Sequence, residues 1–241
     1  MSTCRRSFSD AFRLLWKRPG VFLLIQAPGA LLTLFDKSFM ANLENLPPAQ
    51  ALPWIIPYFC ISVVMTTLIA AATFTAVREE TAGRKSSMVR AFKNVLRQWI
   101  PLVAASIISG VVILAGFYAY LVPGIIVMGL YLFLPQLIID EPGSALMIYF
   151  NRSWRLARAH VWATTTLVLI ILAITMAAYF SDAMIVAALG RFFASGTETV
   201  PPFFQWAARG GQLVLTLVGE AMADLWVCCY FLQIRLEGGN K

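Results

Sequence analysis

The sequence predicts an all-α protein, a polytopic membrane helix bundle with about six transmembrane helices. Apolar residues make up 59% of the chain and charged residues only 13%, whereas an average soluble protein carries roughly 25% charged residues. Several apolar runs reach about 18 to 23 residues, which is the length that crosses a ~30 Å hydrocarbon core. These runs are continuously apolar rather than alternating, and this pattern favours helices over the strands of a membrane barrel.

The predicted spans divide the whole chain, so we expect residues 1–241 to form a single integral membrane domain. The expected spans are residues 21–40, 54–77, 100–121, 124–139, 161–180 and 211–234. Between the last two lies a predicted outer region, in which residues 184–193 are apolar enough for an interfacial helix.

Proline and glycine mark the expected kinks and turns of these spans. Pro28 and Gly29 lie in the middle of the first span, where proline removes a helix hydrogen bond and predicts a kink. Pro123 and Gly124 are predicted to make the outer turn before the fourth span, and Pro135 should kink that span. In the third span, small residues four positions apart at Ser106 and Gly110 would let another helix approach closely.

Three segments outside the spans have the pattern of amphipathic helices at a membrane surface: residues 7–18, 87–98 and 144–160. The predicted apolar stripes are Phe8, Ala11, Phe12 and Leu15; Met88, Ala91, Phe92, Val95 and Trp99; and Leu146, Phe150, Trp154 and Ala157. Basic residues on the opposite sides are candidate contacts for anionic lipid headgroups. They are Arg13, Lys17, Arg90, Lys93, Arg97, Arg152, Arg155 and Arg158. The alternative is that these charges only set the topology.

The placement of positive charge predicts the orientation of the chain. Sixteen of the 19 lysines and arginines fall before the first span, after an even-numbered span, or in the tail. The three on the other side are Lys37, Arg191 and Arg209. Positive residues stay in the cytoplasm, so both termini are expected there. We therefore assign the net charge of +7 to membrane topology and to contacts with membrane lipids, not to nucleic-acid binding.

The first two surface segments match at a constant offset of 80 residues, with Ala11 against Ala91 and Phe12 against Phe92. The third fits more loosely at a further 62, and each segment precedes a pair of spans. These matches predict a threefold internal repeat with units of approximately 1–80, 81–140 and 141–241. The alternative is convergence, because any helix lying on a membrane must alternate in this way.

Part of the chain resembles a known family. The residues Val122-Pro123-Gly124-Ile125-Ile126, then Pro135, then Ser153-Trp154-Arg155-Leu156, with Gly83-Arg84 and Ala91-Phe92 before them, carry the likeness. They resemble the YciC-type bacterial inner-membrane proteins and the related membrane domain attached to some glycerophosphodiester phosphodiesterases. The likeness is specific over about residues 80–165. It implies a six-span protein of the bacterial inner membrane, and it brings neither an established activity nor catalytic residues.

Glu220 and Asp224 are the strongest candidates for chemistry, because they lie one helical turn apart near the middle of the sixth span. A carboxylate in lipid costs a few kcal/mol and usually faces a bundle interior or a wet cavity. The pair could act as a proton or cation relay, or as a protonated or hydrogen-bonded pair that fixes helix packing. No catalytic or phosphate-binding motif stands in the sequence, and its single histidine, His160, has no cluster of ligands for a metal.

Two functions therefore remain open. The first is a non-enzymatic membrane protein, without cofactor or metal, that organises the envelope or contacts lipid through its surface helices. The second is a small transporter or proton-coupled permease that uses Glu220 and Asp224.

Overall fold

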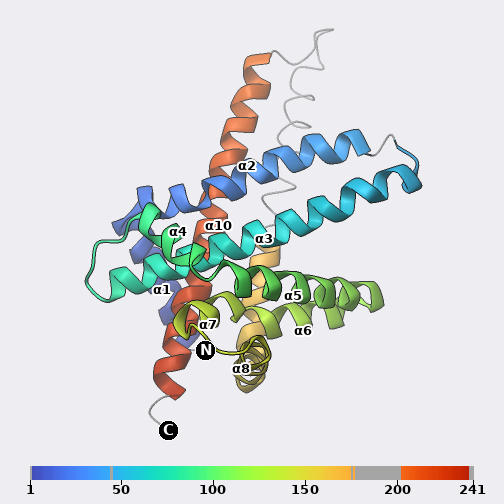
Figure 1. Ribbon diagram of the computed structural model, residues 1–241. Helices are drawn as coiled ribbons and strands as arrows, with labels where there is room; N and C mark the ends of the chain where they lie inside the picture. The colour runs from blue at the N-terminus through green and yellow to red at the C-terminus, as the bar shows by residue number, and fades with distance from the viewer. Residues whose placement is uncertain (1, 44–45, 175, 177–201, 239–241) are drawn as a thin grey trace.

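The computed structural model describes residues 2–43, 46–174, 176 and 202–238, and every regular element within these ranges is a helix (Figure 1). The predicted all-α class is confirmed. The apolar segment 184–193 and the predicted outer residue Arg191 lie outside the described residues.

Four described helices are long and apolar enough to cross a membrane: Pro53–Thr81, Trp99–Tyr118, Pro123–Asp140 and Leu213–Leu236. Leu146–Ala159 and Val161–Ile174 make a fifth candidate if they count as one span, although they meet at an angle of 98°. The multi-pass character is thus supported by four or five apolar helices. Six spans remain a prediction. The predicted span 21–40 lies in a region whose apolar helix covers only Pro19–Leu32, and the segment predicted at 161–180 runs beyond the described residues.

From α1 to α8 the helices follow one another with short connections. Helices α1 (Ser2–Lys17), α2 (Pro19–Leu43) and α3 (Pro48–Thr81) come first, followed by α4 (Met88–Leu96), α5 (Trp99–Ala119), α6 (Leu121–Tyr131), α7 (Leu134–Asp140), α8 (Leu146–Ala159) and α10 (Pro202–Gly238). Helices therefore stand at all three predicted surface segments. The threefold repeat itself stays a prediction.

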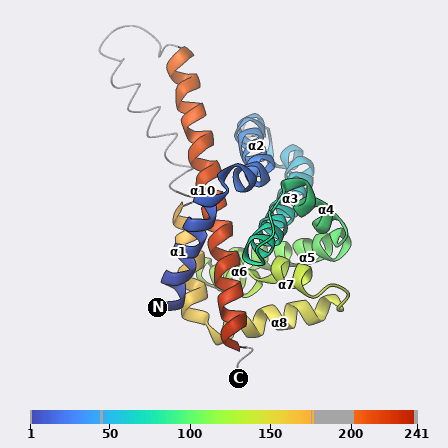
Figure 2. The same ribbon diagram turned by 90° about the vertical axis from the view of Figure 1, so that its left-hand side faces the viewer.

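Two helical hairpins and one long helix make up the architecture. Helices α2 and α3 lie side by side, as do α5 and α6, and both hairpins extend toward the right in Figure 1. In both ribbon views α10 runs across the bases of these hairpins rather than alongside them (Figures 1 and 2). The sequence pattern identifies α10 as apolar, but it does not predict this crossing.

The core lies where α10 meets α3 and the junction of α6 and α7. Phe74 of α3 packs edge-on against Phe231 of α10, with ring centroids 5.5 Å apart. Phe133, at the α6–α7 junction, lies 5.8 Å from Phe231 and 6.2 Å from Tyr230. All four rings are buried, so this aromatic cluster joins all three repeat units that the sequence predicts.

The predicted outer turn at Pro123 and Gly124 is wrong, because both residues lie inside the first turns of α6. The chain reverses at Tyr120, whose extended backbone separates α5 from α6. A Cβ on Gly116 would lie 3.1 Å from the Cα of Gly124. Gly124 is therefore needed for the close approach of two helices rather than for a turn, as its Cβ would lie only 2.4 Å from the ring of Phe117.

A short interruption of the helix precedes Pro135, where the sequence predicts a kink. Helix α6 ends at Tyr131 and α7 begins at Leu134, so Pro135 lies in the first turn of α7, where it needs no backbone donor. The buried side-chain amide of Gln136 lies 3.1 and 3.3 Å from two carbonyl oxygens of the break when its nitrogen faces them. From α8, the hydroxyl of Ser153 donates to the carbonyl of Leu130 at 2.7 Å.

The other predicted packing features have mixed outcomes. Gly110 allows close contact with α3, since a Cβ there would lie 3.2 Å from Val63. Helix α2 continues through Pro28, and a kink at this residue stays a prediction. Gly29, expected to share that kink, lies close to two side chains: a Cβ there would lie only 3.1 Å from Ile69 and 3.3 Å from Glu220.

Candidate functional site

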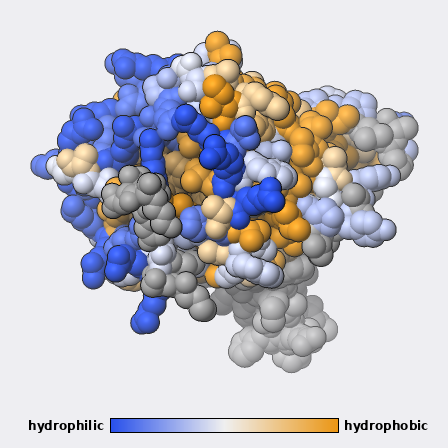
Figure 3. Space-filling model, turned by 90° about the horizontal axis from the view of Figure 1, so that it is seen from below, coloured by the Kyte–Doolittle hydropathy of each residue, from blue (hydrophilic) through white to orange (hydrophobic). Residues whose placement is uncertain are grey.

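Hydrophilic residues gather at one side of the molecule. Seen from below, they cover the left of the surface, which is the side of α1 and α4 in Figure 1, while hydrophobic residues cover much of the middle and right (Figure 3). The polar side holds the end of α3, the start of α4 and the charged turn after α7. It is where the sequence predicts the cytoplasmic surface.

A cluster of ion pairs surrounds Asp140 and Glu141, at the end of α7. Arg235 of α10 pairs with both carboxylates, and Arg152 of α8 pairs with Glu141. Arg78 of α3 lies 3.4 Å from the carboxylate of Asp140. The Asp140 side chain is only 10% exposed, so these arginines offset the cost of burying its charge. The cluster ties α3, α7, α8 and α10 together at the polar side.

Glu80 forms a second charged cluster, at the end of α3. Its side chain is 3% exposed, and the cations of Lys17 and Arg18 lie 3.4 and 3.5 Å from its carboxylate. The backbone N–H and the hydroxyl of Ser86 both donate to the same carboxylate, at 3.0 and 2.9 Å. This arrangement fixes the α1–α2 junction against the loop that leads into α4.

Glu80 and Glu141 each precede a glycine turn that leads into a surface helix. Gly83 and Gly143 have φ angles of 75° and 92°, in the left-handed region that glycine adopts without strain. After the second turn, the hydroxyl of Tyr149 donates to the carbonyl of Glu141 at 2.6 Å and accepts from the N–H of Ser144. An acidic residue followed by glycine thus closes a span and starts a surface helix twice in the described chain.

Helix α1 is held against α10 by polar and aromatic contacts. The indole N–H of Trp226 donates to Ser7 at 3.1 Å, and the rings of Phe8 and Trp226 meet edge to face at 5.0 Å. Further along, the amide of Gln233 donates to the carboxylate of Asp10 at 2.9 Å. The buried face of α1 therefore runs through Ser7 and Ala11, while the predicted stripe residue Phe12 is 52% exposed.

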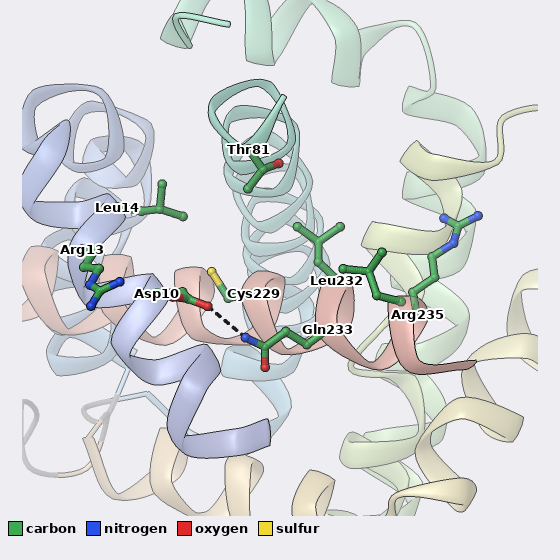
Figure 4. A pocket seen from close by; sticks show the side chains of 9 residues that line it. Asp10, Arg13, Leu14, Thr81, Cys229, Leu232, Gln233 and Arg235 are labelled. Carbon is green, nitrogen blue, oxygen red and sulfur yellow. Dashed lines mark hydrogen bonds between the residues drawn. The ribbon is translucent and has the colours of Figure 1, made fainter. Parts of the chain in front are cut away.

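A hollow of about 770 Å³ opens beside these contacts, and we call it the α1–α10 hollow (Figure 4). Its lining includes Asp10, Arg13, Leu14, Leu232, Gln233 and Leu236. Figure 4 shows the Asp10–Gln233 hydrogen bond on one side of this space, with Leu14 and Leu232 on the two helices around it. A second hollow of about 580 Å³ shares Asp10 and Arg13 and adds Arg5, Arg6 and Ser9.

Asp224, one of the predicted intramembrane pair, belongs to a polar cluster on three helices. The amide of Gln26 in α2 donates to the carboxylate of Asp224 at 2.6 Å, and it lies 3.5 Å from the hydroxyl of Thr73 in α3. Gln26 and Thr73 are buried, whereas Glu220 and Asp224 are half-buried. Neither of the two hollows described above is lined by Glu220 or Asp224.

The predicted lipid-contacting cations divide into two groups. Lys17 and Arg152 form ion pairs with Glu80 and Glu141. The rest are exposed, and the described part of the chain has no ion pair for them; they are Arg13, Arg90, Lys93, Arg97, Arg155 and Arg158.

Sequence reasoning missed the acidic partners and Gln26. The acidic residues stand at the ends of predicted spans beside glycine, so their turns could have been recognised from the sequence. Their partner cations could not have been recognised, because the pairing depends on how α8 and α10 pack near the end of α3 in the folded chain. Gln26 stands three residues before Gly29 in the first predicted span, and an amide at that position needs a partner in the membrane.

Comparison with known proteins adds no relative: no family model, no curated protein and no solved structure matches this chain. The likeness to YciC-type inner-membrane proteins therefore stays a prediction.

Proposed function

We propose that this chain is a non-enzymatic multi-pass membrane protein whose polar side holds anionic lipid headgroups. One observation carries the proposal: on α1 and α8, and at the start of α5 directly after α4, exposed aromatic residues lie near exposed cations that have no ion pair in the described chain. In water such apolar patches would promote aggregation or binding. At a membrane surface, Trp rings sit at the depth of the headgroups and Lys or Arg side chains contact the phosphates.

Helices α1 and α8 supply both kinds of side chain, and beside α4 the exposed ring comes from Trp99, the first residue of α5. On α1, Phe12 and Trp16 stack with centroids 5.8 Å apart, and Trp16 is 76% exposed. Trp99, 54% exposed, follows α4, and Trp154, 42% exposed, lies on α8. Trp162, just after α8, is 86% exposed. These rings lie beside the predicted cationic faces rather than in the protein core.

The buried faces of these helices leave the large rings on the outside. Ala11 of α1, Ala91 and Val95 of α4, and Ala157 of α8 are buried against the longer helices. Small side chains let a helix axis approach its neighbour closely. The aromatic residues then stay at the rim, where they can enter the lipid. The 98° angle between α8 and the following helix is also what a surface helix leading into a span requires.

We further propose that this polar side faces the cytoplasm of a bacterial inner membrane. The charge asymmetry of the sequence supports it, because 16 of the 19 lysines and arginines are expected on that side. Anionic lipids of the inner leaflet then attract each exposed cation by about 1 kcal/mol. The cations on α1, α4 and α8 would then give three such contacts with the leaflet.

The test compares lipid retention by charge-matched variants. The purified chain is exchanged into nanodiscs with equal amounts of phosphatidylglycerol and phosphatidylcholine, and the lipids that remain after partial delipidation are counted by native mass spectrometry. Arg155→Gln with Arg158→Gln should reduce the enrichment of anionic lipid severalfold, at about 1 kcal/mol per charge. Lys37→Gln with Arg209→Gln removes the same charge on the predicted outer side and should change nothing. Equal effects of the two double variants would refute the proposal.

The Gln26–Asp224 hydrogen bond supports a second candidate, a proton-coupled permease. A carboxylate at the junction of three helices, with a second one a turn away, is the arrangement that proton relays use. Proton flux into liposomes would be followed with a pH dye under an imposed potential. If flux depends on the protein and disappears in a folded Glu220→Gln, Asp224→Asn variant, the permease is supported. If only thermal stability changes, the pair is a packing device.

A further inference from the structure

The α1–α10 hollow combines an apolar wall with hydrogen-bonding groups of both kinds. Leu14 of α1 and Leu232 and Leu236 of α10 line it with apolar groups, while Asp10, Arg13 and Gln233 supply the polar groups (Figure 4). Cys229 and Leu236, both in its lining, are seven residues apart along α10, a rise of about 10 Å. That depth suits a headgroup with its glycerol and the first methylene groups of an acyl chain.

One acceptor in this hollow has no donor. Gln233 uses its side-chain nitrogen to bond Asp10, and its buried Oε1 has no hydrogen-bond partner among the described residues. A buried acceptor left unsatisfied costs about 1–3 kcal/mol. The Asp10 carboxylate beside it can accept further hydrogen bonds as well. The hollow therefore favours a ligand that brings neutral or positive donors to these two side chains.

The same site is rich in cations that attract a phosphate. Arg13 is exposed and lines both hollows, and Arg5 and Arg6 line the neighbouring one. Asp10 is the only carboxylate lining either hollow in the described part of the chain. Arg235 also lines the larger hollow, but it is held by Asp140 and Glu141. The neighbouring arginines thus leave a positive surplus for one anionic group.

We infer that the α1–α10 hollow is a binding site for a single phosphatidylglycerol molecule. Its phosphate pairs with Arg13, its glycerol hydroxyls donate to Gln233 and Asp10, and one acyl chain lies along Leu14 and Leu232. The inference rests on the proposed function, since the hollow must lie at a lipid surface. It goes further by naming one site and one headgroup, whereas the proposed function requires only a general preference for anionic lipid.

The headgroup assignment is tested by competition in native mass spectrometry. The delipidated full chain is titrated with phosphatidylglycerol, phosphatidic acid, phosphatidylethanolamine and phosphatidylcholine in equal amounts. We expect one saturable copy of phosphatidylglycerol, retained about fivefold better than phosphatidic acid, which has a phosphate but no headgroup hydroxyl. Equal retention of phosphatidic acid would overturn the role of Gln233. Better retention of phosphatidylethanolamine would show that an ammonium is the donor and would overturn the assignment.

Variants separate the site from the general lipid surface. Arg13→Gln should lower the affinity of the single copy about fivefold, and Gln233→Leu should remove the preference over phosphatidic acid. Asp10→Asn keeps an acceptor for Gln233 but removes the negative charge, so it should raise retention of phosphatidic acid. Its folding check is an unchanged unfolding temperature. If Arg13→Gln and Gln233→Leu both fold and leave the single copy unchanged, the site is refuted.

The control variant is Arg158→Gln, which removes an exposed cation of α8 that does not line the α1–α10 hollow. It should reduce general enrichment of anionic lipid and leave the saturable phosphatidylglycerol in place. If Arg158→Gln lowers the general enrichment of anionic lipid but the unmodified chain holds no saturable phosphatidylglycerol, the site is refuted and the proposed function stands. No enrichment of any anionic lipid in the unmodified chain would sink both.

Discussion

Replacing Gly124 with alanine tests the close packing of α5 against α6. The Cβ of an alanine at this position would lie 2.4 and 2.5 Å from the Cδ1 and Cγ atoms of Phe117. Carbon atoms pack at about 3.5–4.0 Å. The contact includes Cγ, the atom that joins the ring to the rest of the side chain. Rotation of the ring about the Cβ–Cγ bond leaves Cγ in place and cannot relieve the contact. Either the whole side chain or the helix must shift by about 1 Å.

The expected magnitude follows from two opposing terms. Forcing an extra methyl group into a packed helix interface costs about 1–3 kcal/mol. Alanine in place of glycine within a helix contributes a gain of about 1 kcal/mol. We therefore expect Gly124→Ala to lose up to about 2 kcal/mol. Gly210→Ala is the matched control, because Gly210 lies within α10 and no heavy atom would lie within 4 Å of its Cβ.

The measurement is unfolding in mixed micelles with increasing dodecyl sulfate, followed by tryptophan fluorescence. Gly210→Ala should be neutral or stabilising, and Gly124→Ala should unfold at less denaturant. Combining Gly124→Ala with Phe117→Ala should recover at least about 1 kcal/mol relative to the sum of the single changes, since the two positions are in contact. If Gly124→Ala is as stable as Gly210→Ala, the close approach of the two helices is refuted.

Three further predictions use the same unfolding measurement. Arg235→Gln removes one of the arginines that pair with the nearly buried Asp140 and should lower the free energy of unfolding by about 1–3 kcal/mol. Arg152→Gln, whose partner Glu141 is more exposed, should lower it by less than about 1 kcal/mol. Equal losses of stability would contradict the described cluster. Ser153→Ala removes a buried hydroxyl that bonds α6 and should cost about 1–2 kcal/mol, with no change in lipid retention. Asp224→Leu should cost about 1–3 kcal/mol because the α2 amide loses its acceptor, and Asp224→Asn, which keeps an acceptor, should cost clearly less.

The sequence predicted the helices well because their signals are local. Apolar runs of sufficient length predicted the candidate spans, and alternating apolar and basic residues placed helices at α1, α4 and α8. A kink at Pro135 was predicted because proline acts on its own backbone, and the interruption between α6 and α7 lies just before this residue. The function of Gly124 was not, because a glycine next to proline has the same local signature in a turn and in a close helix contact.

The buried faces of the surface helices were also predicted incompletely. The predicted apolar stripes include Phe12 and Trp154, which are substantially exposed, while Ser7 and Ser153 outside these stripes are buried. The stripe pattern separates apolar from basic residues and does not say which residues face the protein and which face the lipid. In a membrane protein the lipid is equally apolar, so steric fit decides which residues face the neighbouring helix.

The distinction between paired and unpaired cations limits what charge counting can say about lipid binding. Lys17, Arg18, Arg78, Arg152 and Arg235 all pair with Glu80, Asp140 or Glu141 within the described chain. A paired cation has much of its charge balanced inside the protein and attracts a phosphate less strongly. The lipid contacts are therefore expected to concentrate on α1, α4 and the second half of α8, where the cations have no such partner. Charge removed from these helices should change lipid retention, and charge removed from the ion-pair clusters should change stability.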